Sequence, residues 1–138
     1  MIIGIGIDSV EIARFALWHN YPEKTLSRIF STSEIEYCLG KNTLCAQRFA
    51  IRFAAREALY KALSQYDPSH TIPLLTLCAA TKITYNKKAP EISIDWEKIK
   101  QYCTQPVDNI TSLLSMTHSQ SIATAITLLQ KPPNASIF

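Results

Sequence analysis

Glycine is scarce in this chain of 138 residues, which contains only Gly4, Gly6 and Gly40. The phosphate-cradling turns of the P-loop and of the dinucleotide fingerprint need several glycines just before a helix. Gly4 and Gly6 lie inside an apolar run, and Gly40 stands alone. Both glycine-rich loops are therefore absent, and any phosphate must be held by other groups.

The sequence also lacks the cysteine and histidine spacing of a zinc site. Its four cysteines include no C-x-x-C pair, and they lie at Cys38, Cys45, Cys78 and Cys103. The first eight residues contain no basic segment of the kind that opens a secretion signal, and they end in an aspartate. We therefore expect reduced, mostly buried cysteines in a cytoplasmic protein.

Long apolar runs and a strong charge imbalance are missing as well. No run reaches the roughly 18 residues that indicate a membrane-spanning helix, so we expect no membrane partner. The net charge of +3 is too small to indicate nucleic acid, although clustered cations would suit an acidic partner. With 47% hydrophobic and 18% charged residues, the composition is typical of a globular chain. We expect a single domain over residues 1–130 and a C-terminal tail over 131–138.

Isoleucines alternate with Gly4, Gly6 and Asp8 near the N-terminus, which predicts a strand over residues 2–10. Apolar spacing then predicts helical segments over residues 11–20, 24–30, 31–40 and 44–63. The third begins with a capping box of Ser31 and Glu34. The fourth carries an alanine at every fourth residue, which lets a helix pack closely against a sheet.

The second half of the chain is expected to supply most of the strands. We expect a polar loop over residues 64–73, a strand over 74–85 and a second strand over 91–94. A helix that begins at Asp95 is expected over 95–103, and a final hairpin over 110–129. The predicted fold is α+β. A small, mostly antiparallel sheet packs on the long alanine-bearing helix, with shorter helices beside it.

Asp8 and Glu57 are the first candidates for chemistry. Glu57 has an ordinary alternative explanation, an ion pair with Lys61 one helical turn later. However, the glycine face that carries Asp8 can dock on the alanine face near Glu57 and bring the two carboxylates together. Adjacent carboxylates repel each other unless a cation or a proton lies between them. An all-oxygen ligand set favours Mg²⁺, whose remaining ligands are typically waters and phosphate oxygens.

A phosphate-bearing substrate would then need further cations and hydroxyl groups. Lys61 and Arg52 are candidates on the long helix, and Ser115, Thr117 and His118 are candidates on the final hairpin. Each has a plainer alternative. Ser115 and Thr117 fit the polar face of an ordinary strand, and His118 fits an exposed hairpin turn.

Three segments resemble, in order and spacing, motifs of the holo-[acyl-carrier-protein] synthase family of phosphopantetheinyl transferases. Residues 4–15, GIGIDSVEIARF, look like the family's opening motif. Residues 52–62, RFAAREALYKA, resemble its central R-F-[AS]-x-[KR]-E-A-x-x-K-A motif. Residues 115–118, SMTH, followed by 122–125, IATA, are similar to its C-terminal S-x-T-H…A-x-A hairpin. The resemblance spans roughly residues 1–130.

The resemblance implies transfer of 4′-phosphopantetheine from coenzyme A to a serine of apo-acyl carrier protein in fatty acid biosynthesis. It implies that Asp8 and Glu57 hold Mg²⁺ and that Lys61 neutralises charge developing on phosphate. Arg52 and the hairpin residues 115–118 would line the coenzyme A site. The proton acceptor stays open between Asp8, Glu57 and a metal-bound water.

The resemblance also implies protein partners. Arg14 and Arg28 match basic positions that contact the acidic carrier protein, although a solvated face is the alternative for both. The family assembles as a homotrimer with its sites at subunit interfaces. We expect the same assembly for this chain.

The sequence departs from the family pattern in three places. Residues 64–68, with Asp67, replace a glycine-rich turn near the phosphates, Leu113 replaces a common histidine, and residues 88–90 lack the glycine of a G-x-P turn. These changes motivate one alternative, a module that binds coenzyme A or carrier protein without turnover. A second alternative is a small Mg²⁺-dependent phosphohydrolase.

Overall fold

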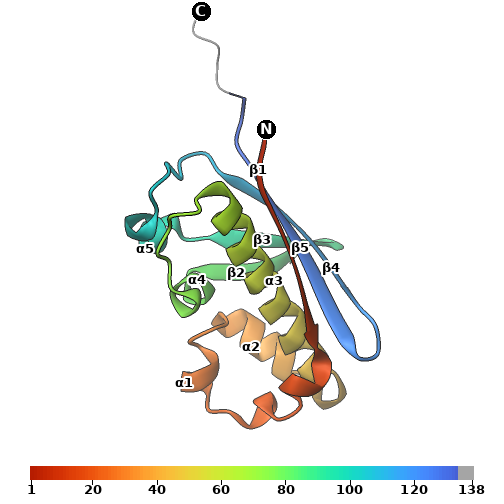
Figure 1. Cartoon of the computed structure of the whole chain (residues 1–138). Coiled ribbons are helices and arrows are strands. Elements are labelled where there is room, and N and C mark those ends of the chain that lie inside the picture. The colour runs from red at the N-terminus through yellow and green to blue at the C-terminus, as the bar shows by residue number, and fades with distance from the viewer. Residues whose placement is uncertain (134–138) are drawn as a thin grey trace, which may run out of the picture.

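Helix α3 (Cys45–Tyr66) is the longest element of the computed structural model, which describes residues 1–133, and it runs along strand β1 (Figure 1). A three-stranded antiparallel sheet covers it in the order β1 (Ile2–Glu11), β5 (Ile122–Gln130), β4 (Thr111–His118). A separate antiparallel pair is formed by β2 (Thr81–Asn86) and β3 (Ala89–Ile94). The predicted α+β fold, with an antiparallel sheet on a long helix, is confirmed.

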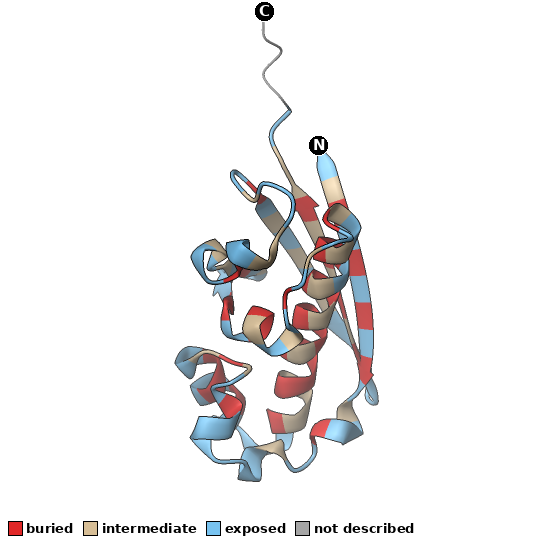
Figure 2. Ribbon diagram, turned by 60° about the vertical axis from the view of Figure 1, so that its left-hand side comes forward, coloured by how far each residue is buried: buried red, intermediate tan, exposed pale blue. Residues whose placement is uncertain are grey.

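The glycines of β1 allow it to approach α3 very closely. Along β1, buried and exposed residues alternate, and the glycines lie on the buried side (Figure 2). A Cβ atom built on Gly6 would lie 1.8 Å from the carbonyl oxygen of Ala58, and one on Gly4 would lie 2.3 Å from that of Ala62. Only glycine fits at these positions, so the expected docking of the two small-residue faces is confirmed.

A buried ion pair joins α3 to helix α2 (Thr32–Leu39). Nη1 and Nη2 of Arg56 donate to Oε1 and Oε2 of Glu34 at 2.9 and 2.8 Å, and Nη2 also donates to the Thr81 carbonyl at 2.9 Å. Burial by itself would raise the pKa of Glu34, but the hydrogen bonds and charge of Arg56 outweigh it and lower that pKa. The capping box of Ser31 and Glu34 is confirmed.

The prediction of a helix over residues 11–20 is wrong in type. The segment forms two 3₁₀ turns, η1 (Ile12–Phe15) and η2 (Trp18–Asn20). Phe15 and Trp18, three residues apart, pack their rings together with centroids 4.4 Å apart. Phe15 ends η1 and Trp18 begins η2, and their rings also pack on Phe53 and Phe49 of α3, contacts that a local apolar pattern does not reveal.

The prediction of a single strand over residues 74–85 is also wrong. The first part is helix α4 (Leu74–Ala79), and β2 begins only at Thr81. Pro73 precedes the helix, and Leu77 and Cys78 are buried on one side of it. A short apolar run does not distinguish a buried helix from a strand by periodicity, which explains the error.

The remaining helices are short, and α3 extends beyond its predicted end. They are α1 (Glu23–Leu26), η3 (Asn42–Leu44), α5 (Trp96–Ile99) and η4 (Lys100–Tyr102). Asp67 follows α3, and its buried carboxylate accepts hydrogen bonds from the backbone amides of Thr104 and Gln105. The predicted loop therefore starts later than expected, and Asp67 serves to fix it.

Two further features concern the ends and the surface of the molecule. Of the tail predicted over residues 131–138, residues 134–138 lie outside the described part of the chain. Lys131 is half-buried, and its ammonium group donates to the Tyr66 hydroxyl at 2.7 Å. Among residues 1–133, no helix has both the length and the apolar character needed to cross a membrane.

Candidate functional site

Asp8 lies on the inner face of β1 because it follows Gly4 and Gly6 in the two-residue alternation of the strand. Its side chain is only 9% exposed, and its Oδ1 lies 2.8 Å from Nζ of Lys61. Its Oδ2 is buried and has no hydrogen-bond partner within residues 1–133. A buried carboxylate oxygen without a partner is costly, which indicates that a donor or a cation belongs beside it.

Glu57 lies on α3 one helical turn before Lys61 and is half-buried. Burial raises its pKa, and the adjacent carboxyl group of Asp8 raises it further, while Arg14 and Lys61 act in the opposite direction. The structure thus brings Asp8, Glu57 and Lys61 together, as the sequence predicts.

The Lys61 ammonium group already has two protein acceptors. It donates to Oδ1 of Asp8 at 2.8 Å and to the Ile7 carbonyl oxygen at 3.0 Å. An ammonium group has three N–H donors, so one remains for a ligand. Because the lysine side chain is 55% exposed, that donor can reach a bound anion without rearrangement of the pair.

The carboxylate pair fits a Mg²⁺ ion. The Oδ2 of Asp8 is buried without a hydrogen-bond partner among the described residues, and the pKa of Glu57 is raised first by burial and then by the neighbouring Asp8 carboxyl group. No group of three or more His, Cys, Asp or Glu side chains within the described chain could hold a metal. A site with two carboxylates suits Mg²⁺, which commonly keeps waters and phosphate oxygens as its other ligands.

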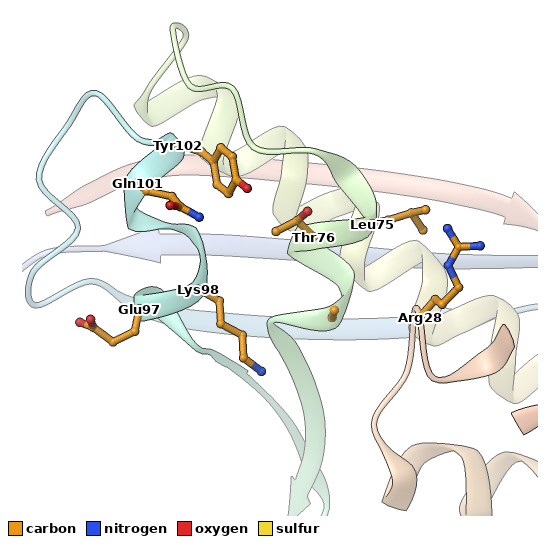
Figure 3. A pocket seen from close by; sticks show the side chains of 8 residues that line it. Arg28, Leu75, Thr76, Glu97, Lys98, Gln101 and Tyr102 are labelled. Carbon is orange, nitrogen blue, oxygen red and sulfur yellow. The ribbon is translucent and has the colours of Figure 1, made fainter. Parts of the chain in front are cut away.

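The two arginines predicted to contact the carrier protein lie in different places. Arg14 is exposed on η1, near enough to Glu57 for its charge to lower the pKa of that residue. Arg28 lies at one end of an open groove of about 630 Å³ formed with α4, α5 and η4 (Figure 3). The groove is lined by Arg28, Leu75, Thr76, Ala79, Glu97, Lys98, Gln101 and Tyr102, and neither Asp8 nor Glu57 lines it.

Arg52 faces α2 rather than the carboxylate pair. Its guanidinium carbon lies 4.6 Å from the centroid of the Tyr37 ring, and its Nη1 donates to the Arg48 carbonyl oxygen at 3.2 Å. The residue is 4% exposed, and its Nε has no hydrogen-bond partner in the described part of the molecule. Arg52 therefore lies in a different part of the same chain from Asp8 and Glu57.

Two of the predicted hairpin residues, Ser115 and Thr117, lie on the other side of the sheet from Asp8, whereas His118 lies on the same side. Ser115 and Thr117 are on the exposed face of β4, whereas Asp8 is on the buried face of β1. His118 ends β4, and its Nε2 lies 3.0 Å from Nε2 of Gln47 on α3. Within one chain, these three residues do not gather around the carboxylate pair.

Arg56 and Gln47 were not identified from the sequence. Nothing in the spacing distinguishes Arg56, which is fully buried, from Arg48, which is half-buried on the same helix. The acidic residue of the α2 capping box is the only related signal, because Glu34 turned out to be the partner of Arg56. Gln47 contacts a residue 71 positions away, and local sequence carries no signal for that contact.

Comparison with known proteins identifies the family. Residues 4–108 match the family model described as the 4′-phosphopantetheinyl transferase superfamily. The chain belongs to this superfamily. The matched region contains the carboxylate pair and Lys61, together with Arg14, Arg28 and Arg52.

Individual relatives agree with this assignment. The chain is 31% identical over 137 residues to the holo-[acyl-carrier-protein] synthase of Geobacter sulfurreducens, covering 96% of this chain and 100% of that protein. It is 49% identical to the enzyme of the same name from Treponema denticola, but only over 46% of this chain and 50% of that relative's length. The crystal structure of the Helicobacter pylori enzyme in complex with coenzyme A is 32% identical with a TM-score of 0.68, and the match covers 91% of this chain and 99% of that one.

Proposed function

We propose that this protein transfers 4′-phosphopantetheine from coenzyme A to a serine of an apo-acyl carrier protein, with Mg²⁺, in the cytoplasm and in support of fatty acid biosynthesis. The observation that carries the proposal is the pairing of Asp8 with Glu57 beside Lys61. Family membership and full-length similarity to a holo-[acyl-carrier-protein] synthase support it.

The reaction balances as a phosphoryl transfer. The serine hydroxyl oxygen attacks the β-phosphorus of coenzyme A and forms a new P–O bond there. The bond from that phosphorus to the bridging oxygen breaks, and adenosine 3′,5′-bisphosphate leaves with the electron pair. The serine proton passes to an oxygen of the carboxylate pair or to a water beside it.

The chain's own residues bind and neutralise the diphosphate in this proposal. Asp8 and Glu57 would hold the Mg²⁺, which when bound supplies positive charge against the diphosphate. The third N–H of Lys61 would donate to a phosphate oxygen as negative charge develops there. Asp8 keeps the ammonium group aimed at this position through its 2.8 Å contact.

The division of candidate residues between two sheet faces supports a site shared by neighbouring subunits. Ser115 and Thr117 project from the face opposite Asp8, and Arg52 faces α2. The outer sheet face also exposes Ile7 and Leu113, each with 57% of its surface accessible. We propose that this face packs against a second copy in a homotrimer, so that Ser115 and Thr117 of one subunit complete the coenzyme A site of another.

The exposed arginines suit an acidic protein partner. Arg14 lies near the carboxylate pair, and Arg28 lies at one end of the groove formed with α4, α5 and η4. Cations on the approach to a site raise the association rate of an acidic partner and fix its orientation. We propose that both contact the acyl carrier protein.

The second candidate is a module that binds coenzyme A or carrier protein without turnover. It is motivated by the end of α3 and the hydrogen-bonded Asp67, which stand where the family has a glycine-rich turn. Intact mass spectrometry separates the two. We expect an apo-acyl carrier protein incubated with this protein, coenzyme A and Mg²⁺ to gain the mass of one phosphopantetheine arm. Binding of coenzyme A without any mass gain would support the module instead. Release of bisphosphate without a carrier protein would indicate a phosphohydrolase.

A further inference from the structure

Strand β1 is the edge strand of its sheet, so the main-chain groups along one side of it have no strand partner. Two side chains of α3 reach this edge. The Gln65 side-chain oxygen accepts a hydrogen bond from the Ile5 amide at 2.8 Å, and the Lys61 ammonium group donates to the Ile7 carbonyl oxygen at 3.0 Å. Lys61 and Gln65 are four residues apart, so they lie one turn apart on the same side of the helix.

These two hydrogen bonds matter because the residues in contact between β1 and α3 are small. Where the strand crosses the helix, it presents Gly4 and Gly6 to Ala58 and Ala62. No side chain there is larger than a methyl group, so no knob enters a hole to fix the strand along the helix axis. The ladder with β5 holds one side of β1, and the hydrogen bonds from Lys61 and Gln65 tie its other side directly to α3.

The bond from Gln65 depends on the departure of this chain from its family. Gln65 reaches the Ile5 amide because α3 continues to Tyr66, through the segment where the family has a glycine-rich turn. The Asp67 carboxylate then fixes the end of the helix against the amides of Thr104 and Gln105.

We propose that Gln65 is a positioning residue for the catalytic pair. Its hydrogen bond to Ile5 and the hydrogen bond from Lys61 to Ile7, together called the latch, hold the free edge of β1 on α3 and thereby keep Asp8 next to Glu57. The role is indirect, because the Gln65 side chain bonds the backbone three residues before Asp8. This inference rests on the proposed function only for its catalytic consequence, since the latch itself is a property of the free protein.

The first test uses the free protein without substrate. Gln65→Met keeps the length of the side chain but removes the acceptor, whereas Gln65→Glu keeps an oxygen acceptor. Gln105→Met is the matched control, since that side chain is exposed and hydrogen-bonds nothing in the described chain. We expect the Ile5 amide to exchange with deuterium about fivefold faster in Gln65→Met, as for loss of one neutral hydrogen bond. Exchange should match wild type in Gln65→Glu and in Gln105→Met. Unchanged Ile5 exchange in Gln65→Met would overturn the latch, and it would do so whether or not the protein is a transferase.

The second test separates positioning from stability. A positioning role predicts that Gln65→Met lowers kcat for phosphopantetheine transfer by about tenfold, because small displacements of catalytic groups are costly. It also predicts a KM for coenzyme A within twofold of wild type, and a urea midpoint below that of Gln105→Met by no more than the loss of one neutral hydrogen bond. If Ile5 exchange accelerates while kcat stays at the wild-type value, the latch exists but does not position Asp8, and the proposal fails.

If wild type itself transfers nothing, the proposed function fails, and the affinity for Mg²⁺ alone decides the positioning claim. That affinity is then expected to fall in Gln65→Met, and an unchanged value would overturn the claim.

Discussion

Lys61 and Asp8 form a contact of 2.8 Å between Nζ and Oδ1, while the other oxygen of the same carboxylate is buried and has no hydrogen-bond partner among residues 1–133. Asp8 therefore orients the lysine with one oxygen and leaves the second free for a cation. The two residues come from elements 53 positions apart in the chain, and the glycines of β1 are what allow them to meet.

The first prediction concerns Lys61. Replacing it with methionine keeps the aliphatic stem and removes the donor that faces a phosphate, so we expect kcat to fall about 10²- to 10³-fold. Stability should fall as well, because the buried Asp8 carboxylate loses its ion-pair partner, so the rate is compared under conditions where both proteins are folded. The control is Lys82→Met, since Lys82 is exposed on β2. A transfer rate within twofold of wild type in Lys61→Met would remove this residue from the mechanism.

The second prediction concerns the close approach of β1 to α3. A methyl group on Gly6 would collide with backbone atoms of α3, so we expect Gly6→Ala to lose about 1–3 kcal/mol of unfolding free energy or more. Gly40→Ala is the matched control, because its nearest atom is 3.3 Å away and its φ is −67°. Urea denaturation measures both variants. Equal midpoints for the two would mean that β1 does not lie as close to α3 as described.

The third prediction concerns the buried pair of Arg56 and Glu34. Removing the guanidinium group in Arg56→Met leaves the buried Glu34 carboxylate with only the Nε of Arg52, 4.0 Å away, and loss of a buried ion-pair partner typically costs about 3–5 kcal/mol. A combined Arg56→Met and Glu34→Gln variant should recover part of that loss, because the buried side chain at position 34 then carries no charge. Chemical denaturation of the three proteins gives the comparison. Similar stability for Arg56→Met and wild type would contradict the structural role of this pair.

The fourth prediction is a pH dependence with a defined sign. The pKa of Glu34 is lower in the folded protein than its ordinary value of 4.5. The ionised carboxylate therefore stabilises the fold above that ordinary value, and this contribution is lost as the pH falls toward the folded pKa. We expect the unfolding free energy to fall below about pH 4.5 more steeply in wild type than in Glu34→Gln. Parallel pH profiles for the two proteins would show that another group dominates acid unfolding.

The fifth prediction tests the proposed assembly. Introducing a charge with Leu113→Glu on the outer sheet face should dissociate the homotrimer to monomers in analytical ultracentrifugation, because an unpaired charge cannot be buried there. Transfer should fall with it, since the site would lose the residues from the neighbouring subunit. Leu39→Glu on α2 is the control, as Leu39 is exposed but lies away from this sheet. A monomeric wild type with full activity would contradict the shared site.

The sequence was sufficient to predict β1, α3 and the meeting of Asp8 with Glu57. Their signals are strong because glycines and alanines recur at the spacing of a strand face and a helix face. Residues 74–85 were predicted wrongly because a short apolar run fits a buried helix as well as a strand. Segment 11–20 was predicted wrongly because its turn type depends on aromatic packing against distant residues.

The less local parts of the site could not be predicted. The Arg56–Glu34 pair joins residues 22 positions apart, and the Gln65–Ile5 hydrogen bond joins residues 60 positions apart. Neither contact can be predicted from the local sequence pattern. The placement of Ser115 and Thr117 opposite Asp8 depends on which face of the sheet α3 covers. Motif spacing gives the residues of a candidate site, but it does not show whether one chain or two bring them together.

The most direct test measures the rate of phosphopantetheine transfer by Asp8→Asn and Glu57→Gln across a Mg²⁺ titration. Intact mass spectrometry of the carrier protein monitors the transfer. Asp108→Asn serves as the control, because Asp108 is exposed and lies outside the site. We expect both site variants to lose about 10²-fold or more in rate, because each removes charge that would position the metal against the diphosphate. Their circular dichroism should match wild type, and Asp108→Asn should transfer normally. Wild-type rates in both site variants would contradict the assignment of Asp8 and Glu57 as the catalytic pair.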